Sequence, residues 1–255
     1  SLFEAIIWEA QDSTGQRGFD IAYLNPVIFY RPVEFSIGSP DNALLGLNLS
    51  VKIGKRNLAY GQLLLDEFKI KEVTAMDGWW GNKQAFQLGF KSFDAFRIPN
   101  LFAQLEYNYI RPYTYAHRIP LQAYGHYGQP LAHPIGANTM ELLGRFQYHH
   151  KRFYFDYKIL FAVYGEDENG LNYGKDIFKD YDSRAKDYDN FVGQGLRTNL
   201  TYNDIRLSYL INPAYNLNFS IGYINRMQKN AVADNNMNYF YVALRTSIEN
   251  YYYDF

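Results

Sequence analysis

The segment RFYFDYKILFAVY, residues 152–164, decides the fold because its apolar side chains recur at every second position. Successive side chains of a β-strand point to opposite faces of the sheet, so this period of two predicts a strand with one apolar face. Asp156 and Lys158 lie on the opposite, polar face. The apolar face carries Phe153, Phe155, Tyr157, Ile159, Phe161 and Val163.

The same alternation recurs along the chain, for example in LGLNLSVKIG at 45–54 and LNFSIGY at 217–223, and no helical stripe competes with it. An all-β, antiparallel fold is therefore predicted, organised as a single domain over residues 1–255. About eleven strands are expected, at residues 1–10, 27–38, 44–54, 57–67, 84–93, 100–110, 138–150, 152–164, 194–212, 217–228 and 238–250.

The connections between these strands alternate in length. Short turns are expected at 54–57, 94–100, 149–151 and 212–216, and long loops near 68–83, 111–137, 165–193 and 229–237. Short turns at one end and long loops at the other are typical of a transmembrane outer-membrane β-barrel. Because bacterial single-chain barrels have an even number of strands, an odd count predicts the C-terminal part of a larger barrel.

The stretch GLRTNLTYNDIRLSYLIN, residues 195–212, is read as one long strand, because two strands would place the carboxyl terminus outside the cell. Its apolar positions change parity between Tyr202 and Ile205. Such a change requires a β-bulge near Asn203, or an upper half that projects beyond the lipid.

Composition agrees with a barrel in the outer membrane. The chain has 25 Tyr and 19 Phe and no Cys, yet its mean hydropathy is −0.37. No run approaches the roughly 20 apolar residues of a membrane helix, whereas a membrane strand needs only about 10 residues of alternating polarity. Lipid and lipopolysaccharide are the expected partners. The net charge of −1 argues against nucleic acid.

Charged residues on the polar faces of the predicted strands would face the barrel lumen, because Arg or Lys on the lipid side costs about 2–4 kcal/mol. Their signs balance, so ion pairs that fill or narrow the lumen are expected. A conduit for sugars or ions is the alternative. The predicted lumen network comprises Lys52, Glu106, Glu141, Arg145, Asp156, Lys158, Arg226 and Arg245.

The final residues YYYDF place Tyr251, Tyr253 and Phe255 at alternate positions. Aromatic rings of this kind occupy membrane interfaces, and the ending resembles the signal read by the barrel-assembly machinery. The parity of these residues differs from that of Phe240 and Ile248, so a bulge or departure from the strand is required. A soluble protein with a docked aromatic tail is the alternative.

The sequence favours no catalytic, metal or cofactor site. It contains no GxSxG motif and no Cys, and its five His include no HExxH spacing. The acidic stretch 165–176 has a calcium-like composition but begins with Gly165 where a first ligand would stand, so a solvated loop is expected. The chain is therefore predicted not to be an enzyme.

Aromatic residues in the long loops suggest a glycan contact, because flat apolar rings beside polar groups suit stacking on sugars. The alternative is that these rings pack the loops together or cap the barrel. The candidate glycan-binding residues are Trp79, Trp80, Tyr113, Tyr115, Tyr124 and Tyr127.

Several stretches resemble one family. They include RGFDIAYLNPVIFYRPVEFSIGSPDNALLG at 17–46, YGQLLLDEF at 60–68, GQPLAHPIGANTMEL at 128–142 and LSYLINPAYNLNFSIGYINR at 207–226. They are similar to the Wzi-like capsule-assembly outer-membrane barrels of Bacteroidota, especially the RemB-like gliding-motility branch. The resemblance covers nearly the whole chain, matches the later portion of the family's length, and concerns architecture rather than chemistry.

The resemblance implies a barrel at the cell surface that engages polysaccharide, as capsule or slime, or the gliding-motility machinery. It carries over no sugar-binding residue. A transport pore with a polar lumen and a structural subunit of a multi-protein outer-membrane secretion or assembly complex remain the alternatives.

Overall fold

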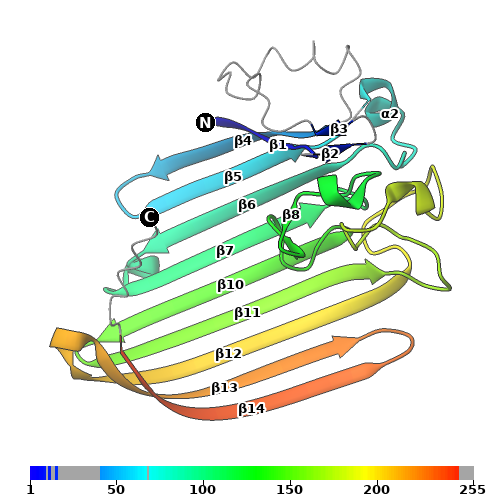
Figure 1. Ribbon diagram of the computed structural model, residues 1–255. Helices are drawn as coiled ribbons and strands as arrows, with labels where there is room; N and C mark the ends of the chain where they lie inside the picture. The colour runs from blue at the N-terminus through cyan, green and yellow to red at the C-terminus, as the bar shows by residue number, and fades with distance from the viewer. Residues whose placement is uncertain (10, 13–14, 17–40, 68, 247–255) are drawn as a thin grey trace.

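The computed structural model describes residues 1–9, 11–12, 15–16, 41–67 and 69–246. In this part of the chain, ten strands form one antiparallel sheet in which successive strands are neighbours (Figure 1). The predicted all-β antiparallel fold is confirmed, and the predicted strand at 27–38 lies outside the described residues. The strands are β1 (Leu2–Ile7), β4 (Asn42–Ile53), β5 (Asn57–Leu65), β6 (Gln84–Phe93), β7 (Leu101–Ile110), β10 (Thr139–His150), β11 (Phe153–Glu166), β12 (Leu196–Asn212), β13 (Leu217–Lys229) and β14 (Asp234–Arg245).

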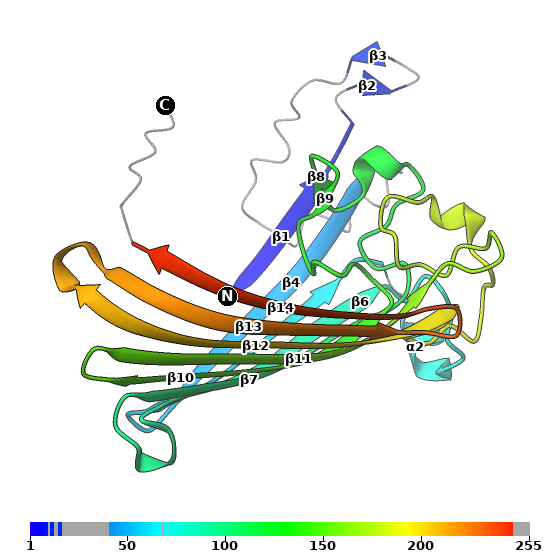
Figure 2. The same ribbon diagram turned by 90° about the horizontal axis from the view of Figure 1, so that it is seen from below.

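The described strands do not close into a barrel. Strand β1 pairs with β4 alone and β14 with β13 alone, so these two strands are the edges of the sheet. The sheet is nevertheless strongly curved along its strands (Figure 2). Two small hairpins accompany it, β2–β3 (Gln11–Asp12, Gly15–Gln16) and β8–β9 (Gly125–His126, Gln129–Pro130), together with one short helix, α2 (Ile70–Ala75).

The alternation of connection lengths is confirmed for most of the sheet. Short connections follow β4, β6, β10 and β12, and the long loops 66–83, 111–138 and 167–195 lie at the opposite end of the strands. These two ends are called the turn end and the loop end below.

The expected long loop at 229–237 is wrong. Strand β14 begins at Asp234, leaving only residues 230–233 as the connection. The Asn225 side chain donates hydrogen bonds to the side chains of Asn236 and Asn238, at 3.1 and 2.9 Å, across the hairpin. Asparagine is rare in strands, so this polar extension is not recognisable from propensity. For the same reason the predicted strand at 238–250 starts too late.

Strand β12 runs unbroken over Leu196–Asn212, which confirms the single long strand. The expected bulge near Asn203 is wrong, because the register is continuous there and shifts only between Leu210 and Asn212. Leu200 and Tyr202 therefore share a face with Arg206 and not with Leu207. The polarity of each face changes along the strand without any break in pairing.

The sheet has two chemically different faces. The face that carries Asn48, Glu106 and Asp156 is called the polar face, and the one that carries Leu47 and Phe155 the apolar face. On the polar face, aromatic rings lie directly over glycines. A Cβ at Gly89 would stand 2.0 Å from Cζ of Tyr60, and one at Gly222 would stand 2.3 Å from Cζ of Tyr241. These glycines let the rings lie flat against the backbone.

A small apolar core lies at the loop end, between the polar face and the loops. Strand residues Leu44, Leu64, Ala85 and Ile110 pack there with Tyr115, Ala137 and Ile177 from the loops. The β8–β9 hairpin accordingly lies over the concave side of the sheet (Figure 2). Packing of the loops against the polar face thus covers its loop end.

Candidate functional site

The eight charged residues predicted to form a network all lie on the polar face. The expected ion pairs among these eight do not form within the described residues. Asp156 instead pairs with Arg206 on the next strand, with Oδ2 2.9 Å from Nη2, and Glu141 lies 3.3 Å from Nε2 of His133 in a loop. Strand register accounts for the Asp156 pair, because Asp156 stands directly opposite Arg206. Lys158 stands opposite Asp204 but forms no ion pair with it, and its ammonium lies over the Tyr202 ring instead.

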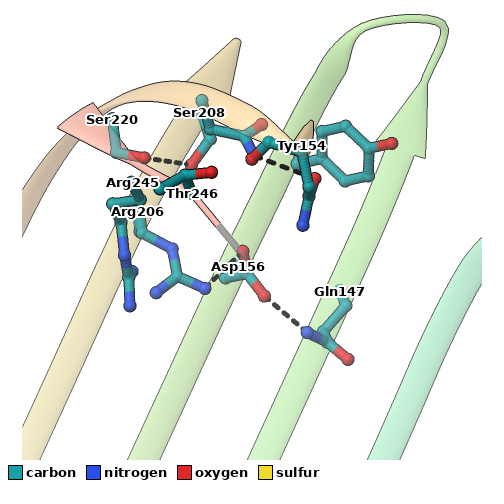
Figure 3. Close-up of a pocket in the computed structure, with 10 residues that line it drawn as sticks. Gln147, Tyr154, Asp156, Arg206, Ser208, Ser220, Arg245 and Thr246 are labelled. Atoms are coloured by element: carbon teal, nitrogen blue, oxygen red, sulfur yellow. Dashed lines mark hydrogen bonds and ion pairs between the residues drawn. The ribbon is translucent and has the colours of Figure 1, made fainter. Parts of the chain in front are cut away.

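Arg206 was not among the predicted site residues. The alternation in IRLSYLI, residues 205–211, places Arg206 on the polar face, away from Ile205 and Leu207. This pattern could have identified Arg206 as a member of the charged network. The second carboxylate oxygen of Asp156 accepts a hydrogen bond of 2.5 Å from the Gln147 amide. Both oxygens of Asp156 are therefore occupied, and the Arg206 guanidinium is held against one edge of the carboxylate (Figure 3).

This ion pair lines a groove of about 340 Å³ at the turn end of the polar face. The hydroxyls of Ser208 and Ser220 are hydrogen-bonded to each other at 2.8 Å on its floor, and both residues are buried. Arg245 also lines the groove, and its guanidinium makes no hydrogen bond or ion pair within the described part of the chain. The complete lining is Gln147, Tyr154, Asp156, Arg206, Ser208, Asn216, Asn218, Ser220, Arg245 and Thr246.

A second polar network lies toward the loop end. The Tyr60 hydroxyl donates a 2.5 Å hydrogen bond to Glu106. The Asn108 amide donates to both Glu106 and Glu141, each at 3.0 Å. A groove of about 380 Å³ beneath the loop is bordered by Glu106, Asn108, Glu141 and His133. The two predicted glutamates are thus linked through a neutral amide.

The remaining predicted charges are separate. Lys158 lies over the Tyr202 ring, with Nζ 5.6 Å from the centroid, and Arg226 donates to Gln228 at 2.7 Å. Lys52 and Arg145 have no ion pair among the described residues. The polar face therefore carries cationic side chains, Lys52 and Arg145, that belong to neither of its two hydrogen-bonded networks.

The aromatic loop residues divide into three groups rather than one surface. Trp80 lies at the centre of the first, with its ring 5.8 Å from Trp79, 6.3 Å from Tyr113 and 4.8 Å from Tyr181, and with the Arg184 guanidinium 4.3 Å above it. Tyr113 is fully buried and donates its hydroxyl to the Asn172 carbonyl. In this group the two tryptophans and Tyr181 are partly exposed.

The second group, Tyr115 and Tyr124, packs in the loop core with ring centroids 6.0 Å apart. The third is Tyr127, which is 93% exposed and lies against His126, at 4.3 Å between centroids. Tyr113 and Tyr115 thus hold the loops together, as the alternative interpretation states. Trp79, Trp80 and Tyr127 keep accessible ring surface, and Tyr124 is half-buried.

A buried lysine anchors the loops to the sheet. Lys83 is completely buried; its Nζ donates to the Ala116 carbonyl at 2.9 Å and lies 3.3 Å from Glu67. Asp66 accepts a 2.8 Å hydrogen bond from the Tyr115 N–H. Burial raises the pKa of Asp66 to about 6, although nearby Lys83 opposes this. The positive charge therefore offsets part of the cost of burying Asp66.

Asn138 joins two long loops and was also missed by the sequence-based prediction. Its amide donates to the carbonyls of Gly165, Tyr173 and Gln194 at 3.0–3.2 Å, and its Oδ1 accepts from the Gly193 N–H at 2.7 Å. It is fully buried, with a φ of 53°. A lone Asn in GANTM has no recognisable pattern that could have revealed this role.

Within the described ranges, no group of three or more His, Cys, Asp or Glu side chains could hold a metal ion, and no helix is long and apolar enough to cross a membrane. Tyr251, Tyr253 and Phe255 lie outside those ranges. In comparisons with known proteins, no protein family, no curated protein and no solved structure matches this chain.

Proposed function

We propose that the sheet is part of the wall of an outer-membrane β-barrel, with the apolar face toward lipid and the polar face toward the interior. The observation that supports this most directly is the exposed apolar face. Leu49 is 63% exposed, Leu88 59% and Leu105 56%. Water-soluble proteins rarely expose contiguous apolar patches larger than a few hundred Å². Here such side chains extend from β4 across the sheet to β14, which suits a hydrocarbon environment.

The distribution of polarity along β12 supports the same orientation. On its apolar face, Ile205 and Leu207 occupy the turn-end half, whereas Asn199 and Asn203 occupy the loop-end half. A membrane strand needs only about 10 residues, and β12 has 17. We infer that the loop-end half projects beyond the lipid.

The two open edges support completion of the barrel by further strands. In hydrocarbon, each unpaired backbone N–H or C=O costs several kcal/mol, so β1 and β14 require partners. These strands could come from other parts of the same protein or from another chain. Either arrangement agrees with the proposed larger, even-stranded barrel.

We further propose that the protein is not an enzyme and acts at the cell surface, where its loops engage polysaccharide or the gliding-motility machinery. One source of support is the accessible rings of Trp79 and Tyr127, which lie beside cationic or polar neighbours; Nζ of Lys69 is 4.5 Å from the centroid of the Trp79 ring. The other is the resemblance to Wzi-like and RemB-like barrels. A transport pore is the second candidate, favoured by the polar face. The loops that cover the loop end of this face argue for surface binding instead.

Site-directed spin labelling tests the membrane orientation, because the chain has no native cysteine. Leu49→Cys and Leu88→Cys place the label on the apolar face, and Ser50→Cys and Gln87→Cys are neighbours on the polar face. In liposomes, the first pair should collide preferentially with oxygen and the second with a water-soluble nickel chelate. Equal accessibility of both pairs to the chelate would exclude the proposed orientation.

Binding to purified capsule or slime polysaccharide tests the loop proposal. Trp79→Ala and Tyr127→Ala should weaken binding at least tenfold. Phe96→Ala is the matched control, because Phe96 is 82% exposed but lies in a connection at the turn end. Unchanged binding by both loop variants would rule out this glycan contact, and planar-bilayer conductance of the full-length protein would favour the pore.

A further inference from the structure

The groove at the turn end of the polar face has the composition of an anion site. Asp156 uses one oxygen for Gln147 and the other for Arg206, so it has little capacity left for a ligand. These contacts hold the Arg206 guanidinium beside the groove, where its other N–H groups remain available (Figure 3). The carboxylate thus acts as a support for a positively charged donor.

Arg245 adds a second guanidinium to the same groove. It is exposed, and it makes no ion pair within the described residues. With two arginines and one aspartate, the groove has a net charge of +1 from its described lining. A single negative charge would therefore neutralise it.

The rest of the lining is neutral and rich in hydrogen-bonding groups. Hydroxyls come from Tyr154, Ser208, Ser220 and Thr246, and an amide comes from Asn218. Part of this capacity is used within the protein, because Ser208 and Ser220 bond each other, Thr246 donates to the Tyr215 carbonyl and the Asn218 amide donates to Asn216. The remaining oxygen lone pairs can accept from a ligand's hydroxyls. The volume of about 340 Å³ lies at the lower end of the range for small-molecule sites.

We propose that this groove binds the carboxylate of an acidic sugar, with the carboxylate on Arg245 and Arg206 and the sugar hydroxyls on the neutral lining. Planar guanidinium groups match a carboxylate in two-point hydrogen bonding. This site would bind the same class of ligand as the proposed function, a polysaccharide. It lies at the turn end of the strands, whereas the aromatic loop residues lie at the loop end. It does not depend on membrane orientation.

Isothermal titration of the full chain in detergent at low salt tests the site, with digalacturonic acid as the probe. Arg245→Gln should weaken binding more than tenfold. Arg245→Lys keeps the positive charge but loses the two-point hydrogen bonding of a guanidinium, so it should weaken binding by a smaller factor. Arg145→Gln is the matched control, because Arg145 lies on the same face outside the groove. The control should change binding less than twofold.

Neutral digalactose should bind at least tenfold more weakly than digalacturonic acid. Equal losses from Arg245→Gln and Arg145→Gln would overturn the site, because they would indicate only a general effect of charge. Inorganic phosphate that binds as tightly as digalacturonic acid would overturn the sugar assignment. Loss of binding in Trp79→Ala but not in Arg245→Gln would leave the loop proposal intact and refute the groove.

Discussion

Replacing Asn138 by Ala should release the two long loops that it joins. The substitution removes the donors for the carbonyls of Gly165, Tyr173 and Gln194 and the acceptor for the N–H of Gly193. All four contacts involve backbone groups from the segment 165–194. The strands themselves keep their pairing, so the effect should be confined to the loops.

The magnitude follows from the geometry. An amide has two N–H donors, so the three carbonyl contacts share two hydrogens, and with the accepted bond the side chain contributes about three hydrogen bonds. At about 1 kcal/mol each, these are worth about 3 kcal/mol. Ala also tolerates the φ of 53° less well than Asn, by about 1 kcal/mol. The sum of about 4 kcal/mol is roughly a thousandfold in the opening equilibrium of the loops.

Limited trypsin digestion and hydrogen exchange measure this opening. The loop offers cleavage sites at Lys175, Lys179, Arg184 and Lys186. Asn138→Ala should be cut there much faster than the parent protein, and the Gly193 amide should lose its protection. Asn48→Ala is the control, because Asn48 accepts a side-chain hydrogen bond on an exposed part of the sheet. Cleavage and exchange rates within twofold of the parent would refute the assignment of Asn138 as the link.

Three further predictions follow from the same structure. The pKa of Asp66 in the folded protein is about 6, above its usual 3.8. The loops should therefore be most stable below about pH 4, and the free energy that opposes their opening should fall by up to about 3 kcal/mol as pH rises to about 6. Hydrogen exchange measured across this pH range would show the loss. Lys83→Met should destabilise the loops by about 3 kcal/mol, because Glu67 and Asp66 lose a buried cation; thermal proteolysis would measure it. Gly222→Ala should destabilise the edge hairpin by about 1–3 kcal/mol through its clash with Tyr241, as hydrogen exchange in β14 would report.

Each of these has its own control. Asp66→Asn should abolish the pH dependence between about 4 and 6, and a slope that persists in this variant would assign it to another group. Lys55→Met, at an exposed turn, should leave loop proteolysis unchanged. For the glycine, a Gly222→Ala, Tyr241→Ala double variant should be less destabilised than the sum of the single variants. Simple additivity would mean that the ring is not the cause.

The strands were predictable because their signal is local. Alternation of polarity every two residues identifies a strand and assigns each side chain to a face, so the sequence alone places Lys52, Glu106 and Asp156 together on the polar face. The single long strand over Leu196–Asn212 followed from the required position of the carboxyl terminus, although its apolar positions change parity. The alternation of short and long connections was also readable. Local patterns failed at Asp234, where an asparagine-rich extension continues a hairpin that propensity alone does not favour.

Partners across strands and between loops were not predictable, because they depend on residues far apart in the sequence. Register, and not charge balance, decides that Asp156 faces Arg206. The loops decide that Tyr113 and Tyr115 are buried while Tyr127 is exposed, although all three have the same aromatic chemistry. The sequence by itself therefore determined the strands and their two faces through a local repeat, whereas long-range packing decided the ion pairs, the groove and the loop core.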